Sequence, residues 1–221
     1  MIMHLGLIIP SSNTVMEEEY SPFVTVHSTR IPLHTVDESH LTHMNTDLQK
    51  AIELIMDCQP DVIAYGCTSG SFLQDITNFF TAITIPWIIT AQAVLSALFT
   101  VEAQTVSVVT PYIDEINTRE QQFLEANGFT VTSIVGMGIR ENTKIGMQNT
   151  DEVLTLAQSL PDSDAIFLSC TNMRTFPIIH QLENTRGVPV ISSNSATLWK
   201  AFQQAGVGPI HHHGRLLEEW L

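Results

Sequence analysis

Two cysteines stand in the same local sequence, Cys67-Thr68 and Cys170-Thr171, 103 residues apart. Each pair follows a short apolar run that is typical of a buried strand, so both thiols are expected at strand ends. A thiol at a helix N-terminus has a lowered pKa and ionises near neutrality. Two thiols that face each other across a cleft can exchange a proton at one carbon from opposite faces, or one sulfur attacks while the other donates a proton. The spacing therefore predicts a two-thiol site, against the ordinary alternative that each cysteine is a small buried hydrophobe.

Small polar residues follow the other apolar runs as well. The segments are PSSNT at 10–14, GCTSGS at 66–71, TPY at 110–112, SCTN at 169–172 and SSNS at 192–195. Ligands of open α/β sheets bind beyond the carboxyl ends of the strands, where helix N-termini attract carboxylate or phosphate groups. We therefore expect an anionic small molecule to be held by neutral donors. The chain has neither a Walker A sequence nor GxGxxG, so nucleotide binding by those routes is not indicated.

Short apolar runs and helical patterns alternate along the chain. Strands are predicted at 4–9, 24–28, 61–65, 87–90, 105–109, 131–135, 164–168 and 188–191. Helices are predicted at about 48–56, 93–99, 114–126 and 152–160, with Asn127-Gly128 as the C-cap of the third. This alternation, with short connections, is typical of a parallel sheet covered by helices, and the fold class is α/β.

The chain also repeats itself with a shift of 103 residues. That shift superimposes identical residues without a gap, namely Asp61 on Asp164, Cys67 on Cys170, Thr68 on Thr171, Pro86 on Pro189, Ile88 on Ile191, Ala93 on Ala196 and Leu95 on Leu198. Such a period is too long for a solenoid and indicates a duplicated domain. We expect two pseudo-symmetric Rossmann-like lobes, each with a mostly parallel four-stranded sheet and with the active site between them. The predicted boundaries are 1–95 plus 200–221 for the first lobe and 96–199 for the second.

Composition excludes several classes of function. The 221 residues carry 9 Lys and Arg against 23 Asp and Glu, a formal charge of −14, which repels nucleic acids and anionic membranes. Apolar runs are too short to span a bilayer, and the N-terminal segment has the pattern of a strand rather than of a signal peptide. Three cysteines, Cys58, Cys67 and Cys170, with no CxxC motif argue against a disulfide scaffold and favour a cytoplasmic setting.

Two further features are assigned no chemistry. Cys58 has no counterpart in the repeat and follows a helix. The run of histidines at 211–213 is not interpreted as a metal site, because consecutive histidines on one loop rarely point at one ion. No metal is expected.

Four motifs together resemble a known family. They are PSSNTVMEEE near the start, GCTSGSF around Cys67, TPY at Tyr112 and SCTNMRT around Cys170. The chain is similar in these motifs to the maleate cis-trans isomerases of the aspartate/glutamate racemase superfamily, which are related to the arylmalonate decarboxylases. The resemblance spans nearly the whole chain and implies two α/β lobes, no cofactor and an active site between the lobes.

The resemblance also implies roles for single residues. Cys67 looks like the nucleophile and Cys170 like its partner acid. Asn13, Tyr112 and Asn142 resemble ligands of the substrate carboxylates, and Thr68, Ser69, Thr171 and Asn172 would complete two carboxylate cradles. The implied reaction is thiolate addition to maleate, rotation about C2–C3 and elimination of fumarate. A small dicarboxylate substrate, no nucleic-acid or membrane partner, and a homo-oligomer are expected.

Other functions stay open at this point. A racemase of the aspartate/glutamate type would use both sulfurs as acid and base, but it needs a site for the substrate ammonium. The decarboxylase relatives keep a thiol at the second position and lack one at the first, so the pair of cysteines counts against decarboxylation. A non-catalytic dicarboxylate-binding module, or another substrate for the same thiol chemistry, completes the alternatives.

Overall fold

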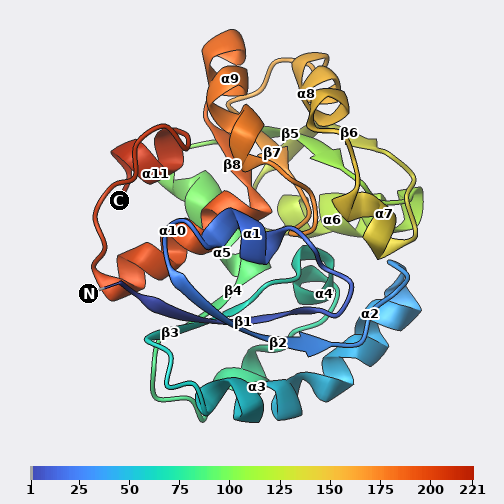
Figure 1. Cartoon of the computed structure of the whole chain (residues 1–221). Coiled ribbons are helices and arrows are strands. Elements are labelled where there is room, and N and C mark those ends of the chain that lie inside the picture. Colours follow the sequence, from blue (N-terminus) through green and yellow to red (C-terminus); the bar gives the residue numbers. More distant parts are fainter. Residues whose placement is uncertain (1) are drawn as a thin grey trace.

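The computed structural model describes residues 2–221 and contains two sheets of four parallel strands each (Figure 1). The first sheet has the order β2-β1-β3-β4, with β1 (His4–Pro10), β2 (Thr25–Ile31), β3 (Val62–Tyr65) and β4 (Trp87–Ile89). The second has the order β6-β5-β7-β8, with β5 (Thr105–Thr110), β6 (Thr130–Gly136), β7 (Ala165–Leu168) and β8 (Val190–Ser192). The two sheets thus have the same topology, which confirms the two-lobed parallel α/β fold expected from the internal repeat.

Helices connect the strands and cover both faces of each sheet. In the first half of the chain they are α1 (Met16–Tyr20), α2 (Glu38–Met44), α3 (Leu48–Met56), α4 (Thr68–Phe72) and α5 (Thr90–Thr100), with short 3-10 helices at Asn45–Asp47 and Thr77–Phe80. In the second half they are α6 (Asp114–Ala126), α7 (Asn142–Gly146), α8 (Thr150–Gln158), α9 (Phe176–Arg186), α10 (Ser193–Ala205) and α11 (Arg215–Glu219). Figure 1 shows α3 on the outer side of the first sheet, α8 and α9 on the outer side of the second, and α5 with α10 between the sheets.

The central strands are buried on both faces because helices cover them on both sides. Every residue of β3 and of β7 is buried, which explains their continuous apolar runs, VIAY and AIFL. Their carboxyl ends point toward the boundary between the two lobes, so the polar segments that follow them meet there. This placement brings the two Cys-Thr motifs together.

Sequence patterns locate all eight strands to within three residues at either end. They also locate α3 and α6 at their observed bounds, with Asn127 as the C-cap of α6. Among the helices of nine or more residues, the sequence analysis missed α9 and α10. Helix α9 carries polar residues between its apolar ones, and α10 is buried around much of its circumference, so neither shows the clean one-sided pattern of a surface helix.

The C-terminal segment contacts both halves of the molecule. Ala205 and Val207 line the same surface hollow as His4 and Asp61 of the first sheet. Further on, the Arg215 N–H donates to the Glu183 carboxylate of α9. The lobe boundaries 1–95 plus 200–221 and 96–199 stay a prediction. Within residues 2–221, no helix combines the length and the apolar character needed to cross a bilayer.

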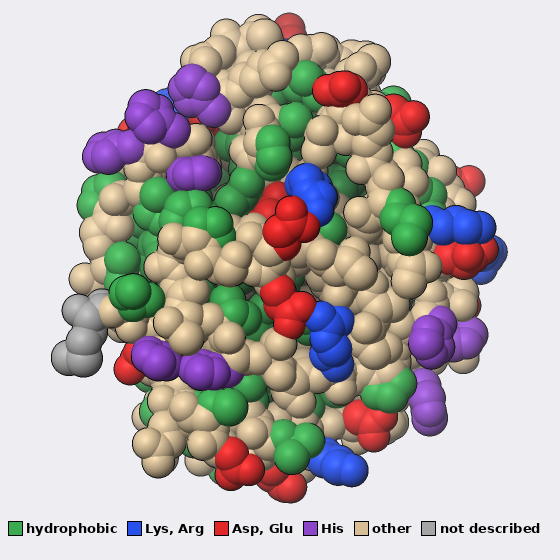
Figure 2. All heavy atoms as spheres, viewed as in Figure 1, with side chains coloured by type: hydrophobic (Ala, Val, Ile, Leu, Met, Phe, Trp, Pro, Cys, Tyr) green, Lys and Arg blue, Asp and Glu red, His purple; other side chains and the backbone are tan. Residues whose placement is uncertain are grey.

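The few basic side chains do not form a basic surface on the face shown in Figure 2, where they stand apart or beside acidic ones. Two of them pair with the acidic run of α1, Arg30 with Glu17 and Arg174 with Glu18. This distribution agrees with the excess of acidic residues in the sequence.

Candidate active site

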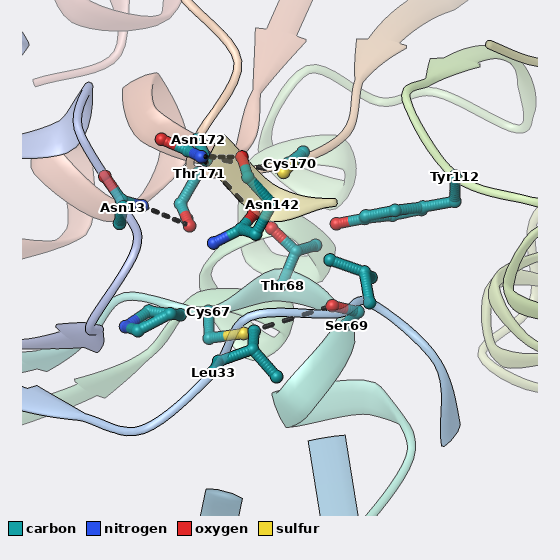
Figure 3. A pocket seen from close by; sticks show the side chains of 12 residues that line it. Asn13, Leu33, Cys67, Thr68, Ser69, Tyr112, Asn142, Cys170, Thr171 and Asn172 are labelled. Atoms are coloured by element: carbon teal, nitrogen blue, oxygen red, sulfur yellow. Dashed lines mark hydrogen bonds between the residues drawn. The ribbon is translucent and has the colours of Figure 1, made fainter. Parts of the chain in front are cut away.

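The residues singled out by sequence line one pocket between the two sheets (Figure 3). The lining comprises Asn13, Cys67, Thr68, Ser69, Tyr112, Asn142, Cys170, Thr171 and Asn172, together with Pro10, Leu33 and Val36. They come from the loops after β1, β2, β3, β5 and β7 and from the start of α7. The structure therefore brings together all nine predicted site residues, while the roles assigned to them stay predictions.

Cys67 occupies the N-cap position of α4. Its backbone is extended, with φ −145°, and its Sγ accepts a hydrogen bond from the Gly70 N–H at 3.4 Å. The Ser69 hydroxyl lies 3.9 Å from the same sulfur. This is the arrangement expected for a thiol at a helix start. The Gly70 N–H and the Ser69 hydroxyl are two local donors that can stabilise the sulfur when the sulfur is negatively charged.

Cys170, like Cys67, is followed by a threonine, but its backbone is different. Its φ is +127°, a region that favours glycine. Its Sγ accepts from the Asn172 N–H at 3.4 Å, and Tyr112 lines the same pocket. No helix begins directly after it, since α9 starts only at Phe176. The expectation that both cysteines sit at helix N-termini is therefore wrong for Cys170.

The pKa values of both thiols are raised, contrary to the expectation from sequence. Burial raises the pKa of Cys67 to about 11, and the hydrogen bond from Gly70 offsets only part of this effect. Burial raises the pKa of Cys170 to about 12. The side chains are 4% and 6% exposed, so removal of water from the charged form outweighs the donors at the sulfur. Both cysteines are thiols at neutral pH in this state.

Amide side chains join the two lobes at the rim of the pocket. The Asn13 amide donates to the Thr171 hydroxyl at 3.2 Å, and the Thr14 N–H donates to Asn172 Oδ1 at 2.8 Å. Asn172 in turn donates to the Asn142 carbonyl at 2.6 Å. These bonds hold the loops after β1 and β7 against α7, so that amide groups from three segments face one small space.

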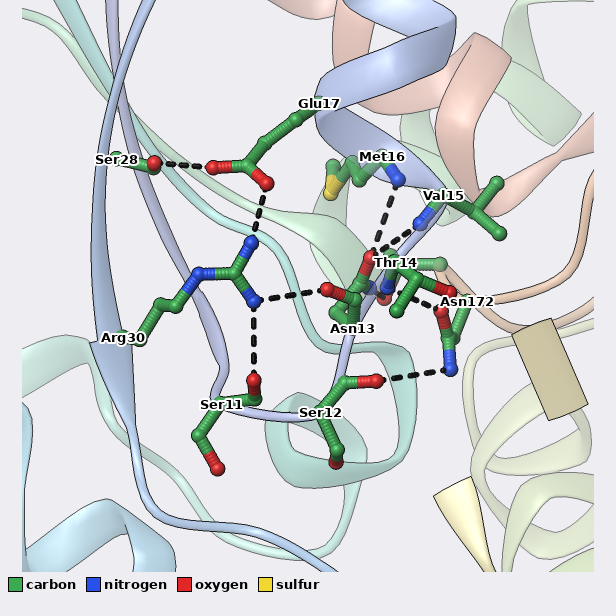
Figure 4. Close-up of polar contacts among 11 residues, drawn as sticks. Ser11, Ser12, Asn13, Thr14, Val15, Met16, Glu17, Ser28, Arg30 and Asn172 are labelled. Atoms are coloured by element: carbon green, nitrogen blue, oxygen red, sulfur yellow. Dashed lines mark hydrogen bonds and ion pairs between the residues drawn. The ribbon is translucent and has the colours of Figure 1, made fainter. Parts of the chain in front are cut away.

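Arg30 on β2 supports the loop that carries Asn13 (Figure 4). Its guanidinium donates to the carbonyls of Ser11 at 3.0 Å and of Asn13 at 2.8 Å, and it also pairs with Glu17. Asn13 Oδ1 accepts from the first N–H groups of the α1 turn, Val15 and Met16, each at 3.1 Å. The loop is thus fixed from both sides, which directs the Asn13 amide into the pocket.

Two apolar side chains from the loop after β2 close the pocket. Leu33 and Val36 line it, and backbone bonds tie their loop to the second lobe. The Val36 N–H donates to the Arg140 carbonyl at 2.7 Å, and the Asn142 N–H donates to the His34 carbonyl at 2.9 Å. The cavity measures only about 10 Å³. It is too small for a dicarboxylate, so binding of one requires part of the lining to move.

Helix α6 supports the opposite wall through two buried polar side chains one turn apart. Asn117 donates to the Tyr112 carbonyl at 3.3 Å, and the Glu120 carboxyl accepts from the hydroxyl of Ser169, the neighbour of Cys170. Burial raises the pKa of Glu120 to about 8, so this carboxyl is neutral at pH 7. A neutral carboxyl there leaves the thiol side of the pocket without negative charge.

The pocket offers hydrogen-bond donors rather than formal charges. None of the twelve described lining residues is Lys, Arg, His, Asp or Glu. Over residues 2–221, no cluster of three or more His, Cys, Asp or Glu is placed to hold a metal ion. Neutral amides, hydroxyls and backbone N–H groups suit a carboxylate, whereas nothing in the lining pairs with an ammonium group.

The sheets and the pocket define a class of two-lobed α/β proteins that present a pair of cysteines to one small polar site. The chain belongs to the arylmalonate decarboxylase family, whose model matches residues 5–217. Among characterised relatives, the maleate isomerase of Nocardia farcinica is 28% identical over 99% of this chain and 96% of its own length. The arylmalonate decarboxylase of Bordetella bronchiseptica is 33% identical, over 61% of this chain and 59% of its own length.

A solved structure of a relative has a fold similar to that of this protein. It is that of a Nocardia farcinica maleate cis-trans isomerase mutant with a covalently bound succinylcysteine intermediate. It has a TM-score of 0.94 and 26% identity, and the match covers 99% of both chains. The family resemblance stated from the motifs is confirmed by these comparisons.

Sequence reasoning missed the residues that shape and support the site. Leu33 and Val36 carry no chemical signal, because apolar residues in a loop have many uses. Arg30 and Glu120 act through partners distant in sequence, and Asn117 acts through the Tyr112 carbonyl five residues before it. The one feature of the sequence that could have pointed to Arg30 is the scarcity of basic residues in this chain.

Proposed function

We propose that this protein catalyses the cofactor-independent cis–trans isomerisation of maleate, or of a close dicarboxylate analogue, to fumarate. The observation that carries the proposal is a pair of buried thiols in one small pocket whose remaining polar lining consists of neutral donors. A dianion with two carboxylates matches that lining. The relatives named maleate isomerase support the same substrate class.

The proposed reaction starts with loss of the Cys67 proton to solvent. The thiolate then forms an S–C2 bond to maleate, and the electron pair of the double bond moves to C3 and its carboxylate. Because C2–C3 is now a single bond, it rotates. The pair returns to re-form the double bond, the S–C2 bond breaks, and fumarate leaves with Cys67 again a thiolate.

Cys170 acts on the neighbouring carbon in this proposal. Its thiol lends a proton to C3 after addition, which gives a succinyl adduct that keeps its two carboxylate charges, and its thiolate takes the proton back before elimination. The Asn172 N–H, which donates to its sulfur, and the Tyr112 hydroxyl, which lines the same pocket, stabilise the thiolate in between. The amides of Asn13 and Asn142 and the donors of Thr68 and Ser69 bind the two carboxylates and stabilise charge that develops on them.

The raised pKa of Cys67 predicts the pH dependence of the reaction. With a pKa of about 11, only about one part in 10⁴ is thiolate at pH 7, and this fraction grows tenfold with each pH unit. We expect kcat/KM for maleate to rise with pH, by up to about tenfold per unit, between about pH 6.5 and pH 8. Initial rates in buffers of constant ionic strength measure this. A flat or falling profile would mean that the attacking sulfur is already ionised.

The alternatives fit the pocket less well. A racemase acting on an amino acid lacks a partner for the substrate ammonium among the described lining residues. Arylmalonate decarboxylation is favoured by the family description and by the Bordetella bronchiseptica relative. Against it stands the thiol at the first cysteine position, Cys67.

Proton NMR of maleate in deuterated buffer with freshly reduced protein tests the proposal. We expect the maleate signal to be replaced by that of fumarate. Phenylmalonate in a parallel tube tests decarboxylation, and aspartate and glutamate test racemisation through loss of the α-proton signal. Unchanged maleate with folded protein would refute the proposed substrate, and a change in one of the other tubes would identify the reaction.

The predicted cytoplasmic location and homo-oligomeric state are parts of the same proposal. The low cysteine count without a disulfide pattern supports the first. Light scattering on the purified protein measures the second, and a monomer at working concentrations would contradict it.

A further inference from the structure

Ser193, the first residue of α10, lies behind the pocket and contacts both cysteine motifs. Its side chain is fully buried and is not part of the pocket lining. Its Oγ accepts a hydrogen bond from the Cys170 N–H at 3.0 Å and another from the Thr68 hydroxyl at 2.8 Å. One oxygen atom therefore joins the loop after β3 to the loop after β7.

The bond to Cys170 falls where the backbone is strained. Cys170 is not glycine, yet its φ is +127°, a conformation that persists only where surrounding contacts hold it. Such outliers gather at functional sites. The Cys170 carbonyl accepts from the nearby Met173 N–H at 3.2 Å, whereas the Cys170 N–H donates to Ser193, which is 23 residues away in the sequence.

The equivalent position in the first lobe shows that this contact is specific to Cys170. Thr90 lies 103 residues before Ser193 and likewise begins its helix, α5. The Thr90 hydroxyl donates to the Tyr65 carbonyl at 2.8 Å instead. Cys67 has an extended backbone with φ −145° and needs no such support. The duplicated motif is thus asymmetric, and Ser193 is on the strained side.

We propose that Ser193 is a positioning residue, whose hydroxyl oxygen holds Cys170 in its strained backbone and fixes the Cys170 loop relative to the Cys67 loop. It does not touch the substrate. The predicted effect of Ser193 on turnover depends on the proposed isomerisation. Its predicted effect on the position of the Cys170 thiol does not depend on that reaction. Two measurements separate these effects.

The first measurement is turnover of maleate by Ser193→Ala. We expect kcat to fall about 10- to 100-fold with KM within about threefold, because misplacing a reacting group lowers the rate while the carboxylate donors stay in place. Ser193→Thr keeps the hydroxyl and is expected to retain kcat within about threefold. Thr197→Val is the matched control, since it removes another buried hydroxyl of α10, which bonds to the Ser193 carbonyl and the Thr90 hydroxyl and to neither cysteine motif. A wild-type kcat in Ser193→Ala, or an equal loss in Thr197→Val, would overturn the proposal.

The second measurement needs no substrate. Iodoacetamide labelling followed by peptide mass spectrometry gives the rate at each cysteine, with exposed Cys58 as the internal reference. In Ser193→Ala we expect Cys170 to react at least about fivefold faster than in the wild type, and Cys67 to change less than twofold. Ser193→Gly, which also lacks the hydroxyl, replaces the alanine variant if that variant does not fold. An unchanged Cys170 rate would refute the positioning role even where the wild type produces fumarate.

The labelling result also stays decisive if the proposed reaction is wrong. A wild type that leaves maleate unchanged would refute the isomerisation. A faster Cys170 reaction in Ser193→Ala would then still establish that Ser193 positions this thiol.

Discussion

Replacing Cys67 with alanine is expected to abolish the conversion of maleate to fumarate, lowering kcat by at least about 10⁴-fold. Rotation about C2–C3 requires that the π bond first be broken, and the Cys67 sulfur is the group proposed to break it. Water does not replace it efficiently, because a neutral water molecule is a far weaker nucleophile than a thiolate. The loss should therefore appear in kcat and not only in KM.

The chain supplies a matched control for this prediction. Cys58 is exposed and lies outside the pocket, so Cys58→Ala removes a thiol without touching the site and should keep full activity. Cys67→Ser is expected to be nearly as inactive as the alanine variant, since a serine hydroxyl is far less ionised near neutrality. Circular dichroism checks that each variant is folded. Turnover by Cys67→Ala within about 100-fold of the wild type would exclude the covalent route through this sulfur.

Replacing Cys170 with alanine should lower kcat by about 10²- to 10³-fold, the range of general acid–base catalysis. In the proposed reaction this thiol lends a proton to C3 and recovers it. Without it, the adduct on Cys67 forms and breaks down only through slower proton transfer from solvent. KM should change little, because the carboxylate donors come from other residues.

The covalent adduct gives a second readout for the same prediction. In Cys170→Ser the group that removes the C3 proton is much weaker, so an acid-quenched reaction should carry the mass of one maleic acid on the peptide that contains Cys67. The double variant with Cys67→Ala should carry none. If Cys170→Ala kept kcat within about threefold of the wild type, Cys170 would be a bystander, and Tyr112 would be the next group to test at C3.

The raised thiol pKa values change how the site must work. A pre-ionised nucleophile would suit a site open to water, but burial keeps Cys67 and Cys170 neutral here. The buried Glu120 is held neutral for the same reason. A pocket with no negative charge of its own is suited to receive a dianion in a protein with a formal charge of −14.

The sequence by itself determined the strand positions and the duplication. Strands such as AIFL in β7 are continuous apolar runs, since a central parallel strand is buried on both faces. The order of elements then required parallel sheets, and the polar segments at strand ends marked the functional edge. Because the Cys-Thr motif occurs twice at one spacing, the pair of thiols and their donors were also readable from the chain alone.

Only the tertiary structure decided the state of those groups. The thiol pKa values depend on how much water the neighbouring lobe removes, and the closure by Leu33 and Val36 depends on backbone bonds across the lobes. The backbone of Cys170 differs from that of Cys67 although both cysteines precede a threonine, and the Cys170 N–H donates to Ser193, which is 23 residues away in the sequence. Local sequence encodes periodicity and residue type. Burial, strain and charge arise from contacts between distant segments, and they exist only once the chain has folded.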